Sequence, residues 1–398
     1  MAAPKKPGKF RVHAVGDSSI TAKWKHRARN ERRFKVRSRR HGESAWKVKR
    51  VRRNRRKVVI RKLEPGTLHE LQVRVCGRGG CSAWSPTRTQ ATLLAPYGDP
   101  YPGLGGCGAF PASGAAPGAP SAADLSAWNQ VGSGAPLHPD SAAIIDRILS
   151  EGGDSFHPDF GSNPEYGIPY TVVPGVQPDV PVGIGPDGYP DESDFGPAPI
   201  PPRAPIEAGS DGHALVIERD GCELYELYRA EYRGGTKNRW VADATAHYDL
   251  DSTALRPAGF TSADAAGLPI FPGLVRYDEV ASGLIDHALR ITFSRTRQAF
   301  IAPATHHASS SCDADLPAMG MRVRLSAGYD TSGLEGQSAV IAAALKRYGA
   351  FVADNGSNFY VTGTTDSRWN DEDLNQMKEI PGSAFEVVRS AAPAVTPC

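Results

Sequence analysis

The densest group of residues that could do chemistry lies in RYDEVASGLIDHALR, residues 276–290. Its polar side chains are Arg276, Tyr277, Asp278, Glu279, Asp286, His287 and Arg290. If this segment is extended, Asp278 and Glu279 point to opposite faces, so one of them enters a cleft while the other meets solvent. Flanking glycines allow sharp turns on either side. We therefore expect His287 and one of these two carboxylates to line the same cleft.

Two kinds of glycan chemistry could use such a cleft. Glycoside hydrolysis needs two carboxyl groups across the scissile bond. Asp278 or Glu279 would supply one of them, and the second would come from Asp211, Glu223 or Asp354. A lyase acting on uronic acids needs a cation to neutralise the sugar carboxylate and a His or Tyr base. Its candidates are His287, Arg290, Tyr277 and His306. The alternative is that all these residues only tie loops to a sheet.

Other chemistry is less well represented in the sequence. Adjacent His306 and His307 diverge on a regular strand, which disfavours a shared metal. The sequence contains no G-x-S-x-G elbow and no phosphate-binding P-loop. One loop could hold a structural calcium ion through Asp187, Asp191, Glu192 and Asp194. A solvated acidic turn explains the same residues, and no other cofactor is expected.

The six cysteines are an even number, which favours disulfides and an oxidising compartment. Cys76 and Cys81 bracket Gly-Arg-Gly-Gly in an expected hairpin, so we expect them to be bonded. Three pairings are open for the other four, which are Cys107, Cys222, Cys312 and Cys398. An extracellular or cell-surface location is therefore expected, although no signal peptide is visible in this sequence. No apolar run approaches the roughly 18 residues of a membrane span.

Charge is strongly divided along the chain. Residues 1–93 carry a net charge of +22 and the remainder −19. The basic part includes RRNRRK, whose candidate binding residues are Arg52, Arg53, Arg55, Arg56 and Lys57. This charge favours contact with a polyanion, such as an acidic polysaccharide or another anionic cell-surface polymer. No motif specifies bases, because RNA-binding aromatic motifs and zinc fingers are absent, and the cysteines disfavour a nucleic-acid partner. The other interpretation is a solvated surface that docks on the acidic part of the chain.

Alternating apolar residues in the basic part predict strands. SITAKW and FKVRSR both show this period, and RRNRRK reads as a loop between strands at 46–51 and 57–63. Residues 6–94 resemble a fibronectin type III domain through Trp24, the segment LEPGT and the ending SAWSPTRTQAT. The resemblance implies a two-sheet β-sandwich, a fold used for spacing and adhesion. His69 stands where the family usually has a tyrosine, so that corner must be built differently.

The rest of the chain divides into a Gly-, Pro- and Ala-rich linker at 95–123 and an acidic domain at 124–398. Two hairpins are predicted, with turns at Asp220-Gly221 and Asn355-Gly356. Other predicted strands are 239–246, 288–293, 298–302, 321–327 and 385–388, and the predicted helices are 141–150 and 338–348. We expect one mainly antiparallel β-rich domain of sandwich or jelly-roll kind. It resembles secreted bacterial proteins of unassigned activity through TSADAAGLPIFPGLVRYDEV, IDHALR and VADNGSNFYVTG.

These observations favour an extracellular protein in which the basic module tethers a carbohydrate-active domain to a polyanionic surface. The domain would bind or hydrolyse a glycan. A hydrolase of neutral glycans is favoured over a polysaccharide lyase, because an acidic domain repels a polyuronate. The alternative is a non-catalytic structural or adhesive protein, including a self-assembling subunit of a surface fibre. Opposite charges on the two parts suit such head-to-tail assembly.

Overall fold

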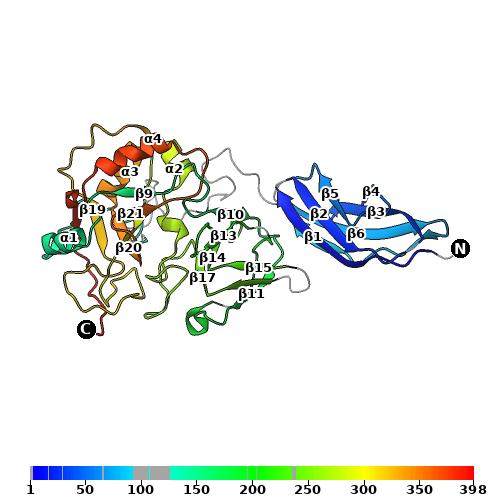
Figure 1. Cartoon of the computed structure of the whole chain (residues 1–398), viewed down its shortest axis with the longest axis horizontal. Helices are drawn as coiled ribbons and strands as arrows, with labels where there is room; N and C mark the ends of the chain where they lie inside the picture. Colours follow the sequence, from blue (N-terminus) through cyan, green and yellow to red (C-terminus); the bar gives the residue numbers. More distant parts are fainter. Residues whose placement is uncertain are drawn as a thin grey trace, which may run out of the picture.

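The computed structural model describes residues 3–16, 18–28, 30–64, 67–92, 107, 126–194, 196–202, 204–234 and 239–398. The expected linker at 95–123 therefore lies outside the described residues except for Cys107. Figure 1 shows a β-domain at the N-terminal end, a pair of sheets in the middle and a sheet with helices at the other end. The expectation of a mainly β chain with few helices is confirmed.

The N-terminal domain is a β-sandwich. One sheet has the order β1 (Gly8–Gly16), β2 (Ser19–Lys25), β5 (Lys57–Arg61). The other has the order β4 (Lys47–Arg52), β3 (Glu31–Arg40), β6 (Leu68–Gly77), β7 (Gly80–Cys81), and β8 (Arg88–Ala91) also pairs with β6. The period-two pattern places Ile20, Trp24, Phe34, Val36 and Val73 between the sheets. RRNRRK joins β4 to β5 as expected, and it carries the chain from one sheet to the other.

The corner near His69 is closed by threonines. The hydroxyl groups of Thr67 and Thr92 both donate to the carbonyl oxygen of Glu64, at 2.6 Å each. The ring of His69 lies 2.8 Å from the Thr67 hydroxyl and is buried. Burial lowers the pKa of His69, which favours the neutral ring at this position. Thr67, Thr92 and His69 thus form the corner in which the family usually has a tyrosine.

Two four-stranded sheets face each other in the middle of the chain. The first has the order β10 (Tyr170–Val173), β13 (Ala214–Glu218), β14 (Glu223–Tyr228), β17 (Ala244–Asp249). The second has the order β12 (Gly196–Ala198), β11 (Val180–Ile184), β16 (Arg239–Ala242), β15 (Glu231–Arg233). Val216, Trp240 and Ile200 fill the space between the sheets. The hairpin turning at Asp220-Gly221 is confirmed by antiparallel β13 and β14.

A mixed six-stranded sheet lies beside the two central sheets and carries the helices (Figure 1). Its order is β22 (Phe385–Val387), β19 (Arg322–Leu325), β20 (Ala350–Asn355), β18 (Leu289–Phe293), β21 (Tyr360–Thr362), β9 (His157–Asp159). The helices are α1 (Ser141–Leu149), α2 (Tyr277–Ser282), α3 (Gly336–Arg347) and α4 (Asp371–Leu374). Single-turn 3₁₀ segments occupy η1 (Pro190–Glu192), η2 (Phe271–Gly273), η3 (Asn375–Glu379) and η4 (Gly382–Ala384). None of the helices in the described ranges has the length and apolarity of a membrane span.

Several sequence-based predictions for this part are wrong. Strands β20 and β21 do not form a hairpin, because β18 inserts between them and pairs in parallel with β20. The expected strand at 239–246 is two strands, which belong to different sheets on either side of Asp243. At 298–302 only isolated bridges from Phe300 form. Parallel pairs also join β10 to β13, β11 to β16 and β21 to β9, so the region is not purely antiparallel.

Candidate functional site

The outer face of the β4-β3-β6 sheet brings basic side chains into rows. Lys35 of β3 lies opposite Arg50 of β4 and opposite Arg74 of β6. Arg33, two residues away on the same face, lies opposite Arg52. Neighbouring strands lie about 4.8 Å apart, so these cations repel one another. Partial burial and the charges of Arg74, Arg33 and Arg50 together lower the pKa of Lys35.

Among the described residues, carboxylates pair with the arginines at the opposite end of this sheet. Arg39 donates to Glu70 at 2.7 Å, and Arg40 lies 2.9 Å from Glu64. Arg37 donates to the amide oxygen of Gln72. No described carboxylate forms an ion pair with the basic group that we call the cationic face, which consists of Arg33, Lys35, Arg50, Arg52, Arg53, Arg55, Arg56, Lys57 and Arg74. All five basic residues of the segment 52–57 are exposed, and Arg53, Arg55 and Arg56 extend the face into the loop after β4.

Two tryptophans beside the cationic face are covered by arginines. The guanidinium of Arg37 lies 4.2 Å from the ring centre of Trp46 and 4.5 Å from that of Trp84. Arg39 also lies over Trp46, and Arg74 over Trp84. These cation–π contacts hold the arginines in place. They also occupy ring faces on which a nucleic-acid base would otherwise stack.

The candidate catalytic residues of the segment 276–290 lie in a helix and a buried network. Asp278 and Glu279 belong to α2, which corrects the expectation that they alternate along a strand. Glu279 lies 3.1 Å from His287. However, both are buried, with 5 % and 1 % of their surface exposed. A substrate has no access to this pair in the present conformation, so the expected cleft is not found there.

This network holds the chain around η2 in place. Arg276 is buried, and it donates to the carbonyl oxygens of Phe271 and Pro272 and to Glu279 at 2.6 Å. Nδ1 of His287 donates to the carbonyl oxygen of Ala288. The contacts therefore join α2, the loop before it and the start of β18, as the structural alternative predicts.

Asp278 and Tyr277 make separate contacts at the other side of α2. Asp278 accepts a hydrogen bond from Arg368 at 2.8 Å and is 9 % exposed. Arg368 also lies over the ring of Tyr277, 4.1 Å from its centre, and that ring makes a T-shaped contact with Trp369. Asp278 therefore binds Arg368, whereas Glu279 binds Arg276.

Arg290 lies at the centre of a second buried group of charges. Its guanidinium makes two bonds to Asp264, of 2.9 and 3.2 Å, and a third to the Thr362 hydroxyl at 2.7 Å. His213 and Glu207 form a neighbouring pair, 2.5 Å apart. Nε2 of His213 donates to the carbonyl oxygen of Ala263, which ties the pair to the loop that carries Asp264.

Strand register adds two more carboxylates to this group. Thr362 pairs with Asp159 of β9, and Asp354 of β20 pairs with Thr292, two residues from Arg290 on the same face. Burial raises the pKa of Asp354 to about 7, and the charge of Asp264 adds to this shift. Asp159 is exposed at the end of β9. Partial desolvation still raises its pKa, where Arg290 opposes the shift and Glu207 adds to it. Of these residues, Asp159, Glu207 and Asp264 carried no local signal in the sequence.

The remaining candidate residues are apart from one another. Nδ1 of His306 donates to the carbonyl oxygen of Ala265 at 2.8 Å, next to the aspartate that binds Arg290. In the expected calcium loop, Glu192 accepts from the backbone of Thr261, and Asp194 accepts from Arg256 and from the backbone of His247. Within the described ranges, no group of three or more His, Cys, Asp or Glu side chains is arranged to hold a metal ion.

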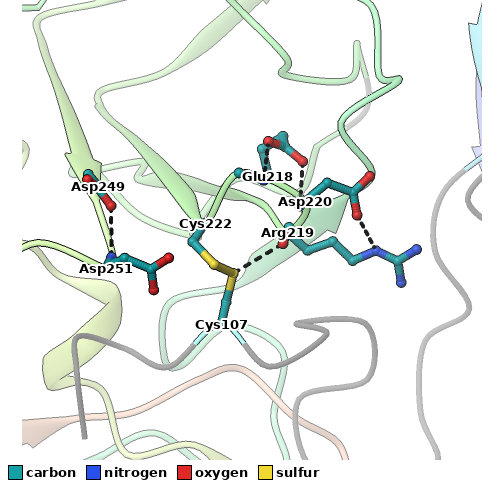
Figure 2. The surroundings of a disulfide bond; sticks show 8 residues. Cys107, Glu218, Arg219, Asp220, Cys222, Asp249 and Asp251 are labelled. Atoms are coloured by element: carbon teal, nitrogen blue, oxygen red, sulfur yellow. Dashed lines mark hydrogen bonds and ion pairs between the residues drawn. A yellow bond between two sulfur atoms is a disulfide. The ribbon is translucent and has the colours of Figure 1, made fainter.

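The structure pairs all six cysteines. Cys76–Cys81 is confirmed, and the two residues lie directly opposite each other on β6 and β7, with Cα atoms 3.9 Å apart. This is closer than the roughly 5.5–6 Å typical of a disulfide. Cys107 pairs with Cys222, and Cys312 pairs with Cys398. Figure 2 shows the bond between Cys107 and Cys222 beside the turn of the β13–β14 hairpin.

Comparison with known proteins identifies the first domain. Residues 5–91 match the model of the fibronectin type III domain, which confirms the resemblance seen in the sequence. Similar solved structures include the FN1–FN3 domains of chicken CNTN1, with 20% identity over 23% of this chain and 33% of that chain and a TM-score of 0.22. They also include the fn3 domain of human contactin 1, with 20% identity over 25% of this chain and 84% of that chain and a TM-score of 0.24.

A third similar structure is the FN5 domain of Drosophila Lar, with 18% identity over 23% of this chain and 97% of that chain and a TM-score of 0.21. The chain spans one third of the length of the chicken CNTN1 structure. No curated protein matches this chain.

Proposed function

We propose that this is an extracellular protein whose fibronectin type III domain binds an acidic polysaccharide and thereby tethers the β-rich remainder of the chain to a polyanionic surface. The observation that carries the proposal is the cationic face. Its sheet residues are held side by side by strand register, and its loop residues are exposed. A row of like charges costs stability in the free protein, and a bound polyanion relieves that repulsion. The three disulfides support an oxidising, extracellular environment.

The covered tryptophans favour a polysaccharide over a single-stranded nucleic acid. Nucleic-acid modules gain much of their affinity from bases stacked on open aromatic faces. In the described part of the domain, Trp46 and Trp84 carry arginines, while Trp24, Phe10 and Phe34 are buried. Point charges on a flat sheet suit a polymer whose sulfate or carboxylate groups repeat along its length.

Heparin binding by the full-length protein tests the proposal. We expect binding that weakens steeply with salt, because each neutralised anion releases a counterion. The triple variant Lys35→Gln, Arg50→Gln, Arg52→Gln should lower the slope of log K against log salt by about two to three. The control variant loses the same charge at the end of the domain that carries Glu64, through Arg40→Gln, Arg61→Gln and Lys62→Gln. It should bind heparin nearly as the wild type does.

Two results would overturn the proposal. One is equal loss of affinity in both triple variants, which would show that total charge acts rather than the cationic face. The other is preference for single-stranded oligodeoxythymidine over heparin at matched charge, which would favour the nucleic-acid alternative.

A further inference from the structure

A polar groove of about 450 Å³ lies at the edge of the mixed sheet. Its walls come from β9, the loop after it, β21 and the segment 371–378. Ligand sites usually measure roughly 300–1,000 Å³, so the groove has the size of a small-ligand site. It is distinct from the cationic face, which belongs to the other domain.

Aromatic rings line one side of this groove. The rings of His157 and Tyr360 stack with their centres 4.7 Å apart and their planes 21° from parallel. Strand pairing fixes this contact, because His157 lies directly opposite Tyr360 on β9 and β21. Tyr166 also lines the groove and leaves 55 % of its surface exposed. An exposed tyrosine ring offers an apolar face with a hydroxyl at its tip, and the C–H face of a sugar ring packs well on such a surface.

Polar groups line the remaining wall and floor. Asn163 uses its carbonyl oxygen to accept from the backbone of Glu165, which leaves its NH₂ group to donate elsewhere. Asp371 accepts two bonds from Ser162, and these bonds lower the pKa of its carboxyl group. Asp159 and Lys378 complete the wall. These groups supply both donors and acceptors for hydroxyl groups, as specific polar contacts in ligand pockets do.

The charges of the groove argue against an anionic ligand. Asp159 and Asp371 face one ammonium group, that of Lys378. Burial and the charge of Lys378 lower the pKa of His157, so this ring is largely neutral at pH 7. The acidic domain around the groove carries further negative charge. A polyanion held by the cationic face is therefore repelled from this groove.

We propose that this groove binds a chain of neutral sugars. The exposed ring of Tyr166 would take the apolar face of one sugar unit, the side of the His157–Tyr360 stack that lines the groove would contact the next unit, and Asn163, Asp159 and Lys378 would bond their hydroxyl groups. Asp159 also connects the groove to Arg290, through its pairing with Thr362. The protein would then hold two glycans, an acidic one through the first domain and a neutral one here. The second site does not depend on the first.

Binding of neutral hexasaccharides to the full-length protein tests this inference. The probes are maltohexaose, cellohexaose, mannohexaose and chitohexaose, each at about 5 mM, above the millimolar Kd of weak binding. We expect at least one of them to bind, with NMR saturation transfer from the protein to the sugar. Tyr166→Ala should weaken that binding at least about fivefold, since the variant removes a stacking ring.

Matched variants make the result specific. Tyr189 is similarly exposed, at 51 %, and does not line the groove, so Tyr189→Ala should bind as the wild type does. The variant Lys35→Gln, Arg50→Gln, Arg52→Gln should bind heparin more weakly and bind the hexasaccharide as the wild type does, which separates failure of the two proposals. No binding of any of the four sugars to the folded wild type would overturn the inference. Equal binding by Tyr166→Ala and Tyr189→Ala would also overturn it.

Discussion

Glu226 shows how a single buried carboxyl group can make stability depend on pH. Its side chain is completely buried on β14, and it accepts hydrogen bonds from the backbone N–H groups of Ile270 and Phe271. Burial raises the pKa of Glu226 from 4.5 to about 7, although the two backbone donors oppose the shift. The carboxyl group thus pins the segment around η2 to the central sheet, and it does so at the cost of desolvation.

We expect this group to make the protein less stable as pH rises. A folded-state pKa above the unfolded value means that the native state binds the proton more tightly. The stabilisation is therefore fully present below pH 4.5 and is lost progressively up to pH 7. The change is roughly 3 kcal/mol. Urea unfolding of Glu226→Gln at pH 5 and pH 8 should show a flatter pH dependence than the wild type.

The exposed Glu231 provides the control for this prediction. Glu231→Gln should retain the pH dependence of the wild type. If Glu226→Gln loses the same stability between pH 5 and pH 8 as the wild type, the pH dependence comes from other groups, and the prediction is wrong.

At the scale of elements, α3 takes its N-terminal cap from another helix. Oδ2 of Asp373 in α4 accepts from the backbone of Gln337 at 2.8 Å, and Oδ1 accepts from the backbone of Ser338 at 3.0 Å. Both donors belong to the first turn of α3, where N–H groups lack partners within the helix. The negative charge also lies at the positive end of the helix dipole. One side chain therefore joins α3 to α4.

Removing this cap should destabilise the fold. Asp373→Ala should lower the free energy of unfolding by about 1–2 kcal/mol, the usual effect of losing an N-cap. Glu372→Ala, an exposed neighbour in the same helix, should have little effect. Thermal or urea unfolding of both variants checks the prediction. Equal stability of the two variants would show that the cap contributes nothing measurable.

At the scale of the whole molecule, the charge division places opposite charges near the contact between the two parts. A cavity of about 590 Å³ lies between the first domain and the segment 177–180. Lys6, Lys9, Arg11, Arg27 and Arg88 line one side of this cavity, and Asp179 lines the other. Among described residues, the ion pairs all stay within residues 3–92 or within 126–398. Any attraction across the cavity therefore acts between these five cations and Asp179 without a direct ion pair.

We expect the arrangement of the two parts to respond to salt. The Debye length shortens from about 8 Å at physiological ionic strength to about 3 Å at 1 M. Small-angle X-ray scattering should therefore report a larger radius of gyration at 1 M NaCl than at low salt. Arg11→Glu with Arg27→Glu should expand the molecule already at low salt, whereas Arg55→Glu with Arg56→Glu should not.

The same series separates the tether from the fibre-forming alternative. Oligomers that dissolve as salt rises would indicate that the opposite charges meet between copies, as expected of a self-assembling subunit. An unchanged monomer at every ionic strength would show that the two parts do not attract each other.

The sequence by itself determined the features that depend on neighbouring residues. Alternation over short segments was enough to find the first sandwich, the hairpin of β13 and β14, and the place of RRNRRK between two strands. The Cys76–Cys81 bond followed from their position in one tight hairpin. Charge division needs no structure at all. Each of these features depends either on contacts between residues close in sequence or on the amino-acid composition alone.

Only the tertiary structure decided which distant segments meet. The turn at Asn355-Gly356 was visible, but the insertion of β18 between β20 and β21 depends on a segment about 60 residues earlier in the sequence. The prediction that Asp278 and Glu279 lie on an extended strand was wrong, because this segment packs as the short helix α2. The group around Arg290 collects charges from β9, β18, β20 and two loops. Ion pairs of this kind form where packing brings opposite charges together away from water. The periodicity of a short segment does not indicate which distant residue will be the partner.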